Sequence, residues 1–221
     1  MQGKRENKVR GYLYTLYGLT AALLAGYAAF ARDWGRLGLA VAALITLCVP
    51  LLAARLFRVR LSPALECAAV VFLFCTMILG EIYRFYEKIP VWDNLLHLSS
   101  GFFFCAFGFA LYADTPPTRS DFPARGFHAA TFSFSCAAVW ELFEFTLDAT
   151  FGTDMQKATW VHGVLDSGLY DTMTDMACGI YGALLFLIYA AFGVYFGFGG
   201  ALAFVPTPRC DREEPRLSAP R

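Results

Sequence analysis

Six long apolar runs dominate this chain and restrict what it can fold into. Each is roughly 17 to 25 residues long, the length an α-helix needs to cross the hydrocarbon core of a bilayer, which is about 30 Å thick. No water is available there to the backbone, so a spanning run must form a helix or part of a closed barrel. The runs cover residues 11–31, 37–57, 67–86, 93–113, 127–148 and 172–196. We therefore predict an all-α fold, a polytopic membrane helix bundle with six transmembrane helices.

The composition agrees with a membrane protein. Hydrophobic residues make up 57% of the chain and charged residues only 16%, which is far from the average of soluble domains. The first apolar run follows basic residues, as a signal peptide does, but it is longer than the roughly 7 to 15 residues of a signal peptide's apolar region. We predict an uncleaved span. Membrane lipids are the expected surroundings, and nothing in the chain indicates nucleic-acid binding.

The basic residues predict the orientation of the spans. Lysine and arginine are enriched in the cytoplasmic loops of membrane proteins. This bias is satisfied when both termini lie in the cytoplasm. An even number of spans agrees with that placement, and the bias favours a multi-pass protein of a bacterial plasma (inner) membrane. The inner segments then hold Lys4, Arg5, Lys8, Arg10, Arg55, Arg58, Arg60, Arg119, Arg125, Arg209, Arg212, Arg216 and Arg221, and the outer segments hold Arg32, Arg36, Arg84, Lys88 and Lys157.

The chain shows no internal repeat and no sign of a second domain. We predict a single transmembrane helical domain over residues 1–205, followed by a disordered cytoplasmic tail over 206–221, where proline, arginine and glutamate are mixed. Glycine pairs occur in two of the spans, and small residues let helix backbones approach closely. These glycines, which predict a tight bundle of the fourth, fifth and sixth spans, are Gly101, Gly108, Gly179 and Gly182.

Seven ionisable residues lie in or at the edge of the last three apolar runs. They are Asp93, His97, Glu141, Glu144, Asp148, Asp171 and Asp175. Within each run they are three or four residues apart and so share one helical face. In the predicted topology all of them fall in the outer third of the membrane. Because charged groups inside a membrane are costly and mark functional sites, we predict one outward-facing acidic pocket.

An oxygen-rich site with one imidazole suits Mg²⁺, Mn²⁺, Ca²⁺ or Zn²⁺. Buried glutamates in such a site are candidate general bases. The predicted metal ligands are Asp93, His97, Asp148, Asp171 and Asp175, and the predicted catalytic residues are Glu141 and Glu144. The same pattern is also compatible with helix capping by the aspartates at the helix starts, with protonated or hydrogen-bonded carboxyls that hold no metal, and with neutralisation of one acid by Arg84.

The connection between the fifth and sixth spans, residues 149–171, is longer than an ordinary loop of roughly 4 to 6 residues. It carries Asp154, Lys157 and His162 among several glycines. One interpretation is a lid over the pocket that contributes ligands. The second is a plain interfacial loop, anchored at headgroup level by Trp160 and Tyr170.

Four motifs carry a resemblance to a known family. They are WDNLLHLSSG at 92–101, WELFEFTLD at 140–148, FGTD at 151–154 and YDTMTDM at 170–176. In this order they resemble the bacterial YjdF-type inner-membrane family, a multispan group of unknown function. The chain departs from that pattern at Tyr170, where tryptophan is expected, and at Asn94, where histidine is frequent. The resemblance implies that six positions correspond to family residues, namely Asp93, His97, Glu141, Glu144, Asp171 and Asp175.

These features predict an integral membrane protein with an outward-facing acidic and histidine pocket that binds a divalent metal. A lipid-directed hydrolase or transferase is the favoured reaction class, although the sequence contains no recognisable nucleophile motif and few basic residues near the pocket. Two alternatives from different classes remain. The protein could be a proton- or cation-coupled transport component, or a structural or partner-binding membrane subunit.

Overall fold

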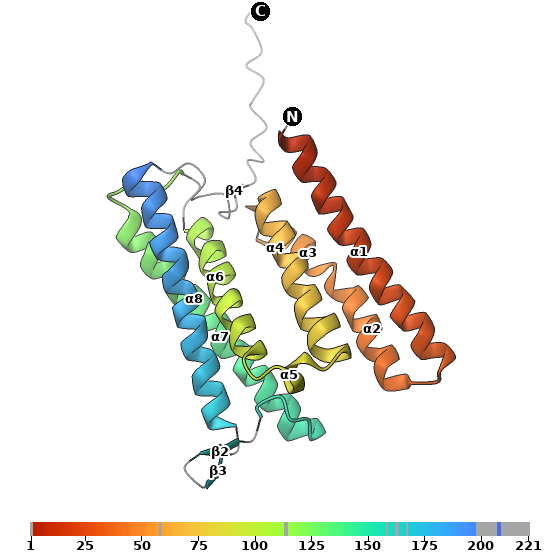
Figure 1. Ribbon diagram of the computed structural model, residues 1–221. Helices are drawn as coiled ribbons and strands as arrows, with labels where there is room; N and C mark the ends of the chain where they lie inside the picture. The colour runs from red at the N-terminus through yellow and green to blue at the C-terminus, as the bar shows by residue number, and fades with distance from the viewer. Residues whose placement is uncertain are drawn as a thin grey trace, which may run out of the picture.

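The computed structural model describes residues 2–57, 59–112, 115–157, 159–161, 164–166, 168–197 and 207–208 (Figure 1). Its helices are α1 Gln2–Phe30, α2 Trp34–Thr46, α3 Val49–Leu56, α4 Pro63–Leu73, α5 Phe85–Lys88, α6 Trp92–Leu111, α7 Phe122–Phe151 and α8 Leu169–Phe196, and a π-helix, η1 Phe74–Ile82, continues α4. Short strands form two antiparallel pairs, β1 Val59–Arg60 with β4 Thr207–Pro208, and β2 Thr159–Val161 with β3 Val164–Asp166. Of the predicted tail 206–221, all but residues 207–208 lies outside the described residues.

Among the described residues, five helical segments are long and apolar enough to cross a membrane. They are Lys8–Phe30, Trp34–Leu56, Pro63–Ile82, Trp92–Leu111 and Leu169–Phe196. This confirms the predicted helical membrane protein. Helix α7 has 30 residues and a length of about 45 Å, which is enough to cross a membrane. It is not among these five segments, because its histidine and its acidic residues make it less apolar. The predicted count of six spans stays a prediction.

Local sequence signals set several helix ends. The Ser62 side chain accepts a hydrogen bond from the Leu65 amide and Pro63 follows it, an arrangement that starts α4. Pro50 near the start of α3 cannot donate a backbone hydrogen bond, and the second span is interrupted before it, between α2 and α3. Helix α7 ends at Phe151 and is capped by Gly152, whose φ of 65° lies in the left-handed region that glycine adopts readily.

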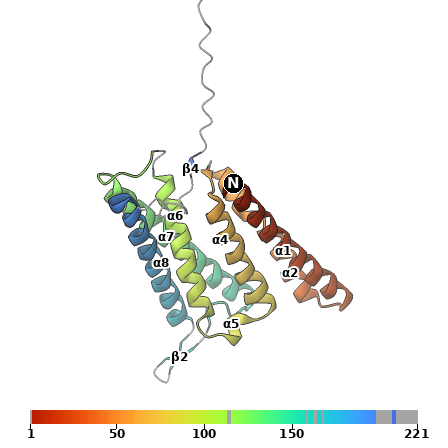
Figure 2. The same cartoon turned by 45° about the horizontal axis from the view of Figure 1, so that its top comes forward.

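The helices pack as two neighbouring groups (Figures 1 and 2). In one group α1 and α2 pack with α4 and η1 around a core that includes Tyr17, Ala43 and Ile78. In the second group, α6, α7 and α8 surround a core that includes Phe109 and Phe186. Helices α6, α7 and α8 are those that carry the seven ionisable residues.

Helices α6 and α8 approach each other through glycine. A Cβ added to Gly101 would collide with the Gly179 backbone oxygen, and one added to Gly182 would collide with the Leu98 backbone oxygen. Gly108 instead lies against the Phe132 side chain of α7. The absence of side chains at Gly101 and Gly182 therefore allows backbone-to-backbone contact between α6 and α8.

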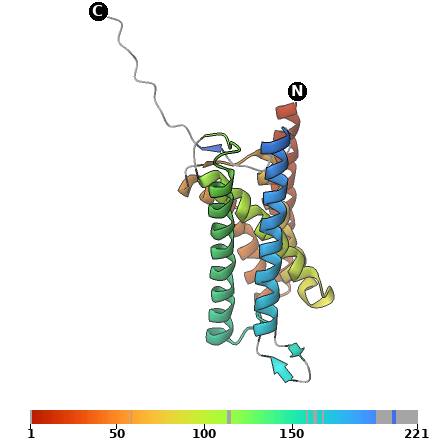
Figure 3. The same ribbon diagram turned by 90° about the vertical axis from the view of Figure 1, so that its left-hand side faces the viewer.

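Chain direction brings the acidic segments to one end of the bundle. Helices α7 and α8 run antiparallel, and the β2–β3 hairpin joins them at the end opposite the start of α1 (Figures 1 and 3). The end of α7, the start of α8 and the start of α6 therefore meet at this end, which we call the hairpin end.

Candidate functional site

Three side chains at the hairpin end have the spacing of metal ligands. The Nε2 atom of His97 lies 3.5 Å from Oδ1 of Asp93 and 3.8 Å from Oδ2 of Asp175, and one ligand atom from each residue lies within 4.8 Å of the others. Two ligands at about 2.1 Å from a tetrahedral metal are about 3.4 Å apart. Asp175 is only 1% exposed and His97 8%. His97 and Asp175 are thus buried and Asp93 is partly exposed, and the three side chains have a suitable spacing and chemistry for a divalent ion.

The glycine contacts of α6 and α8 explain how these side chains meet. Asp93 and His97 are four residues apart on α6 and share a face. Gly101 comes one turn after His97, and Gly179 comes one turn after Asp175. Because the two glycines are in backbone contact, the turns that carry the imidazole and the carboxylate lie side by side.

Two buried carboxylates lie beside the His97 imidazole. Both oxygens of Asp175 and both oxygens of Glu141 have no hydrogen-bond partner among the described residues, and Glu141 is 5% exposed. One Glu141 oxygen lies 3.9 Å from Nδ1 of His97. Native proteins rarely leave buried polar groups unsatisfied unless an ion, a proton or water completes them. A proton, a water molecule or a cation would each complete these oxygens.

Glu144 lies one turn beyond Glu141 on the same face of α7. It is 6% exposed, and its Oε1 accepts a hydrogen bond of 2.7 Å from the indole Nε1 of Trp140. The Trp140 indole therefore orients a predicted catalytic carboxylate.

Asp148 organises the segment that follows α7. Its carboxylate accepts hydrogen bonds from the Thr153 hydroxyl and from the amides of Met155 and Gln156. The Gln156 side chain in turn donates to the Thr172 hydroxyl of α8 at 2.8 Å. In the described residues Asp148 is not part of the group around His97, and its metal role stays a prediction.

We expect Asp148→Ala to loosen this segment, because two amides lose their acceptor. Hydrogen exchange at the amides of Met155 and Gln156 should accelerate about tenfold, the equivalent of about 1.4 kcal/mol. Peptide-level exchange mass spectrometry measures this directly. Glu87→Gln is the control, because Glu87 pairs with Arg84 on the short helix α5. Unchanged exchange in Asp148→Ala would contradict the role assigned to this carboxylate.

Lys157 brings a positive charge from the connecting segment into the site. Its Nζ donates to Oδ2 of Asp93, its backbone amide donates to Asp171 at 3.2 Å, and its ammonium lies 5.5 Å from the centre of the Tyr86 ring. Burial lowers the pKa of Lys157, but the hydrogen bond to Asp93 and the nearby carboxylates outweigh it and raise the pKa above its ordinary value. The ammonium therefore stays charged at neutral pH.

A cavity of about 240 Å³ adjoins the metal-ligand group. Asp93 belongs to both, since it lines the cavity and contacts His97. The remaining lining residues are Tyr86, Pro90, Asn94, Lys157, Tyr170, Asp171 and Thr174. Asp171 thus faces the cavity and Lys157, and in the described residues it does not join the group around His97.

The neutralisation by Arg84 that the sequence allowed was wrong. Arg84 has a left-handed backbone, with φ at 59°, and its guanidinium pairs with Glu87 at 2.6 Å. Lys157, which lies 64 residues from Asp93 along the chain, supplies the positive charge instead. This contact favours the lid interpretation of the connecting segment. His162 and Gly163 of that segment lie outside the described residues.

Sequence reasoning missed Gln156 and gave Tyr86 no role in the pocket. No local signal marks Gln156, because its contact with Thr172 depends on how the segment folds back over α8. Tyr86 could have been suspected from its position before the Asp93 helix, yet an aromatic residue near a membrane surface is more often an interfacial anchor.

Comparisons with known proteins agree with this structure. The family model described as "Predicted membrane protein (DUF2238)" matches residues 12–194. An uncharacterized protein of Thermotoga maritima is 27% identical over 111 residues, which are 50% of this chain and 53% of that protein. The chain thus spans about half the length of this curated relative. No solved structure matches the chain. The chain belongs to the DUF2238 family of predicted membrane proteins.

Proposed function

We propose that this protein binds a divalent metal ion through Asp93, His97 and Asp175. The observation that carries the proposal is the pair of unpartnered Asp175 oxygens beside the Nε2 atom of His97. An imidazole with carboxylates is a donor set for Zn²⁺ or Mn²⁺. Metal-bound histidines usually donate their second ring N–H to a carboxylate, and Glu141 lies on that side of His97. We therefore assign Glu141 to the orientation of the imidazole.

In its membrane setting the protein is proposed to have six spans, with α7 as the fifth, in a bacterial plasma membrane. Both termini are proposed to be cytoplasmic, so the hairpin end faces outward. The basic residues support this orientation, and the narrower likeness to the YjdF-type group supports the bacterial inner membrane. The site would then be open to substrates at the outer surface.

The reaction class we propose is hydrolysis of, or transfer from, a lipid or lipid-linked group. The cavity next to Asp93 offers room for a polar headgroup. A bound metal would supply Lewis acidity and an activated water at such a place. Lys157 can pair with an anionic part of the substrate. Glu144, already oriented by Trp140, is the proposed general base.

Turnover of a lipid panel by the purified protein, with and without added Zn²⁺ or Mn²⁺, tests this reaction class. Glu144→Gln should lower the rate by about 10²- to 10⁴-fold, the range of general base catalysis, while metal content stays unchanged. Glu87→Gln on α5 is the matched control and should keep the wild-type rate. If no lipid is turned over in the metal-loaded protein, the hydrolase or transferase assignment fails and the metal site remains.

Transport of a proton or cation is a weaker candidate. Away from the hairpin end, α6, α7 and α8 meet in an apolar core that includes Cys105, Phe109 and Phe186. The described residues therefore provide no continuous polar path through this helix group. Ion flux in proteoliposomes that Asp175→Asn removes would reverse this preference. For a structural subunit the described residues provide no specific support.

We expect Lys157→Met to strengthen metal binding. The ammonium competes with a metal for Asp93 and repels it, so its removal should lower the Kd for Mn²⁺ about tenfold, the equivalent of about 1.4 kcal/mol. Isothermal titration in detergent measures the constant. Lys88→Met is the control, because the Lys88 ammonium donates to the Tyr83 carbonyl. Weaker binding in Lys157→Met would mean that Lys157 assembles the site rather than competing for it.

A further inference from the structure

The cavity beside Asp93 has hydrogen-bond acceptors on its α8 side. Asp171 and Thr174 both line it, and they are three residues apart, so they share a face of the helix. The Thr174 hydroxyl donates to the Tyr170 carbonyl oxygen at 2.8 Å, which leaves Oγ1 as an acceptor. An ionised Asp171 carboxylate has acceptor sites besides the one used by the Lys157 amide. This wall therefore offers acceptors and a negative charge.

Asn94 of α6 continues this wall. Its Nδ2 atom donates to Sγ of Cys178, 3.6 Å away on α8, and Cys178 is one turn beyond Thr174. The amide oxygen of Asn94 remains as a further acceptor. Asp171, Thr174 and Asn94 thus form an acceptor group along one side of the cavity. A primary ammonium carries a positive charge and several N–H donors, so it matches this side in charge and in hydrogen bonding.

Lys157 is the basic residue among the described residues that line the cavity. One N–H of its ammonium is donated to Oδ2 of Asp93. Because an ammonium has further donors, it can bind an anionic oxygen as well. The Lys157 backbone amide donates to Asp171 at 3.2 Å, so the ammonium and the Asp171 carboxylate are separated by no more than about the reach of one lysine side chain. The cavity thus presents a positive and a negative group to one small ligand.

The aromatic wall beside Lys157 is held in place by a glycine. The centre of the Tyr86 ring lies 5.5 Å from the Lys157 ammonium. A Cβ added to Gly80 of η1 would collide with this ring, so the absence of a side chain at Gly80 makes room for it. Ligand sites are usually pre-formed in this way, and π-helical segments such as η1 frequently accompany functional sites. The wall is therefore a built part of the fold.

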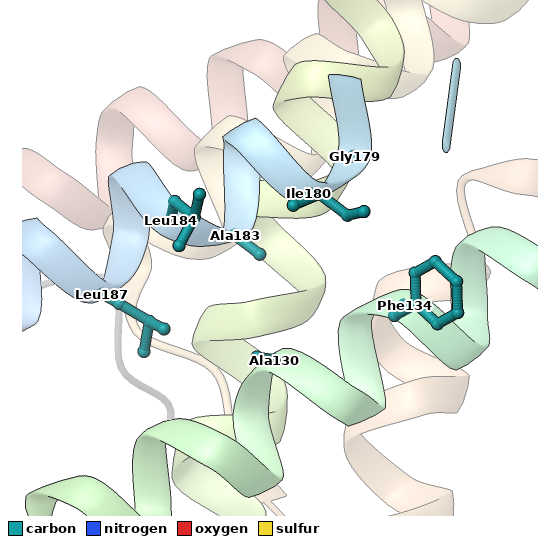
Figure 4. A pocket seen from close by; sticks show the side chains of 7 residues that line it. All are labelled: Ala130, Phe134, Gly179, Ile180, Ala183, Leu184 and Leu187. Carbon is teal, nitrogen blue, oxygen red and sulfur yellow. The ribbon is translucent and has the colours of Figure 1, made fainter. Parts of the chain in front are cut away.

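We propose that this cavity binds a headgroup that carries both a phosphate and a primary ammonium, with the phosphate at Lys157 and the ammonium at Asp171. This inference rests on the proposed lipid-directed function and specifies its substrate class as phosphatidylethanolamine. A glycerol headgroup would leave Asp171 without a positive partner, and a choline headgroup has no N–H to donate to the acceptors. The hollow between α7 and α8 is lined by apolar side chains alone (Figure 4), so it cannot distinguish these headgroups.

Native mass spectrometry of the purified protein in mild detergent tests this proposal, because it measures the Kd of a single bound lipid. Phosphatidylethanolamine, phosphatidylcholine and phosphatidylglycerol are compared with identical acyl chains. We expect phosphatidylethanolamine to bind about tenfold more tightly than the other two. Asp171→Asn should weaken its binding about tenfold, as the loss of a charge-assisted hydrogen bond predicts, and should not weaken binding of phosphatidylglycerol.

Asp33→Asn is the matched control for the removal of an acid. Asp33 also lies at the end of the bundle opposite the start of α1 (Figure 1), where it caps α2 and pairs with Arg36. Asparagine caps a helix as well as aspartate does. This variant should therefore keep the wild-type preference for phosphatidylethanolamine.

Equal Kd values for the three lipids in the wild type overturn the proposal, and so does an Asp171→Asn variant that keeps the preference. If Asp171→Asn misfolds, Thr174→Val replaces it, because it removes an acceptor without changing the charge and should reduce the preference about fivefold. Soluble phosphoethanolamine is titrated in parallel. If it binds as tightly as the lipid, the ligand is a soluble molecule and the lipid assignment is overturned.

Lipid turnover and metal content are measured on the same samples. Selective binding of phosphatidylethanolamine without turnover would refute the proposed reaction and leave the headgroup site standing. Turnover of all three lipids without a difference in Kd would refute the headgroup site and leave the proposed reaction standing. The two proposals can therefore fail separately.

Discussion

His97→Ala is expected to remove the metal from the purified protein. Of the three proposed ligands, the His97 imidazole is the one that lies close to both aspartates. Loss of an outer-shell partner alone costs about 10- to 100-fold in metal affinity, so loss of a ligand should cost more than about 100-fold. Glu141→Gln should fall in the 10- to 100-fold range, and the double variant should retain only background metal. Elemental mass spectrometry of protein purified in mild detergent, without a metal-affinity tag, gives the stoichiometry.

His128→Ala provides the matched control for this experiment. His128 is a histidine of α7 whose Nδ1 is 3.0 Å from the Gly108 carbonyl oxygen, away from the acidic cluster. It should retain the wild-type metal content. Equal metal in wild type and His97→Ala would refute the site as proposed. No metal in any of the proteins would mean that protonated carboxyls account for the unpartnered oxygens.

The second large effect is expected at the glycine contact of α6 and α8. An alanine methyl at position 182 would meet the Leu98 backbone oxygen, and one at position 101 would meet the Gly179 backbone oxygen. Backbone atoms cannot rotate out of the way as a side chain can. Gly182→Ala and Gly101→Ala should therefore each lower the free energy of unfolding by about 3 kcal/mol, the upper part of the usual cost of overpacking.

Thermal unfolding in detergent measures this loss. Gly26→Ala is the control, because an added Cβ at Gly26 of α1 meets nothing within 4 Å. Alanine is favoured over glycine in helices by up to about 1 kcal/mol, so this variant should be neutral or more stable. We also expect Gly101→Ala to lose metal, because it separates the turns that carry His97 and Asp175. Wild-type stability in both α6 and α8 variants would show that the helices are not in backbone contact.

Much of the helical architecture was predictable. The lengths of the apolar runs were enough to predict where the apolar helices lie. A backbone in hydrocarbon must satisfy its own hydrogen bonds, so a long apolar run forms a helix. Helical periodicity also placed Asp93 and His97 on one face of α6. The glycines anticipated a tight bundle of the last three spans, since small residues permit close approach, but not that α6 and α8 would make the backbone contact. The interruption before Pro50 and the π-helix η1 were not predicted, because both are local departures within an apolar run.

The partners of each acid were not predictable to the same degree. Periodicity assigns a helix face but not the rotation of one helix against another, so it could not separate Asp175, which meets His97, from Asp171, which faces the cavity. Asp148 continues the helical spacing of Glu141 and Glu144 along α7, yet its carboxylate accepts hydrogen bonds from amides of the following loop. Lys157, rather than Arg84, supplies the positive charge beside Asp93. This depends on the backbone turn at Arg84 and on the long-range contact of Lys157.

The sequence by itself determined that this is a helical membrane protein and which of its acids share a helix face, because these properties follow from hydrophobicity and period along a single chain. Only the tertiary structure decided which side chains converge on His97 and which cation reaches Asp93. Those contacts join residues of different helices and of the connecting segment. They depend on how α6 and α8 pack at their glycines and on how the segment after Asp148 folds back, and neither is encoded in the spacing of neighbouring residues.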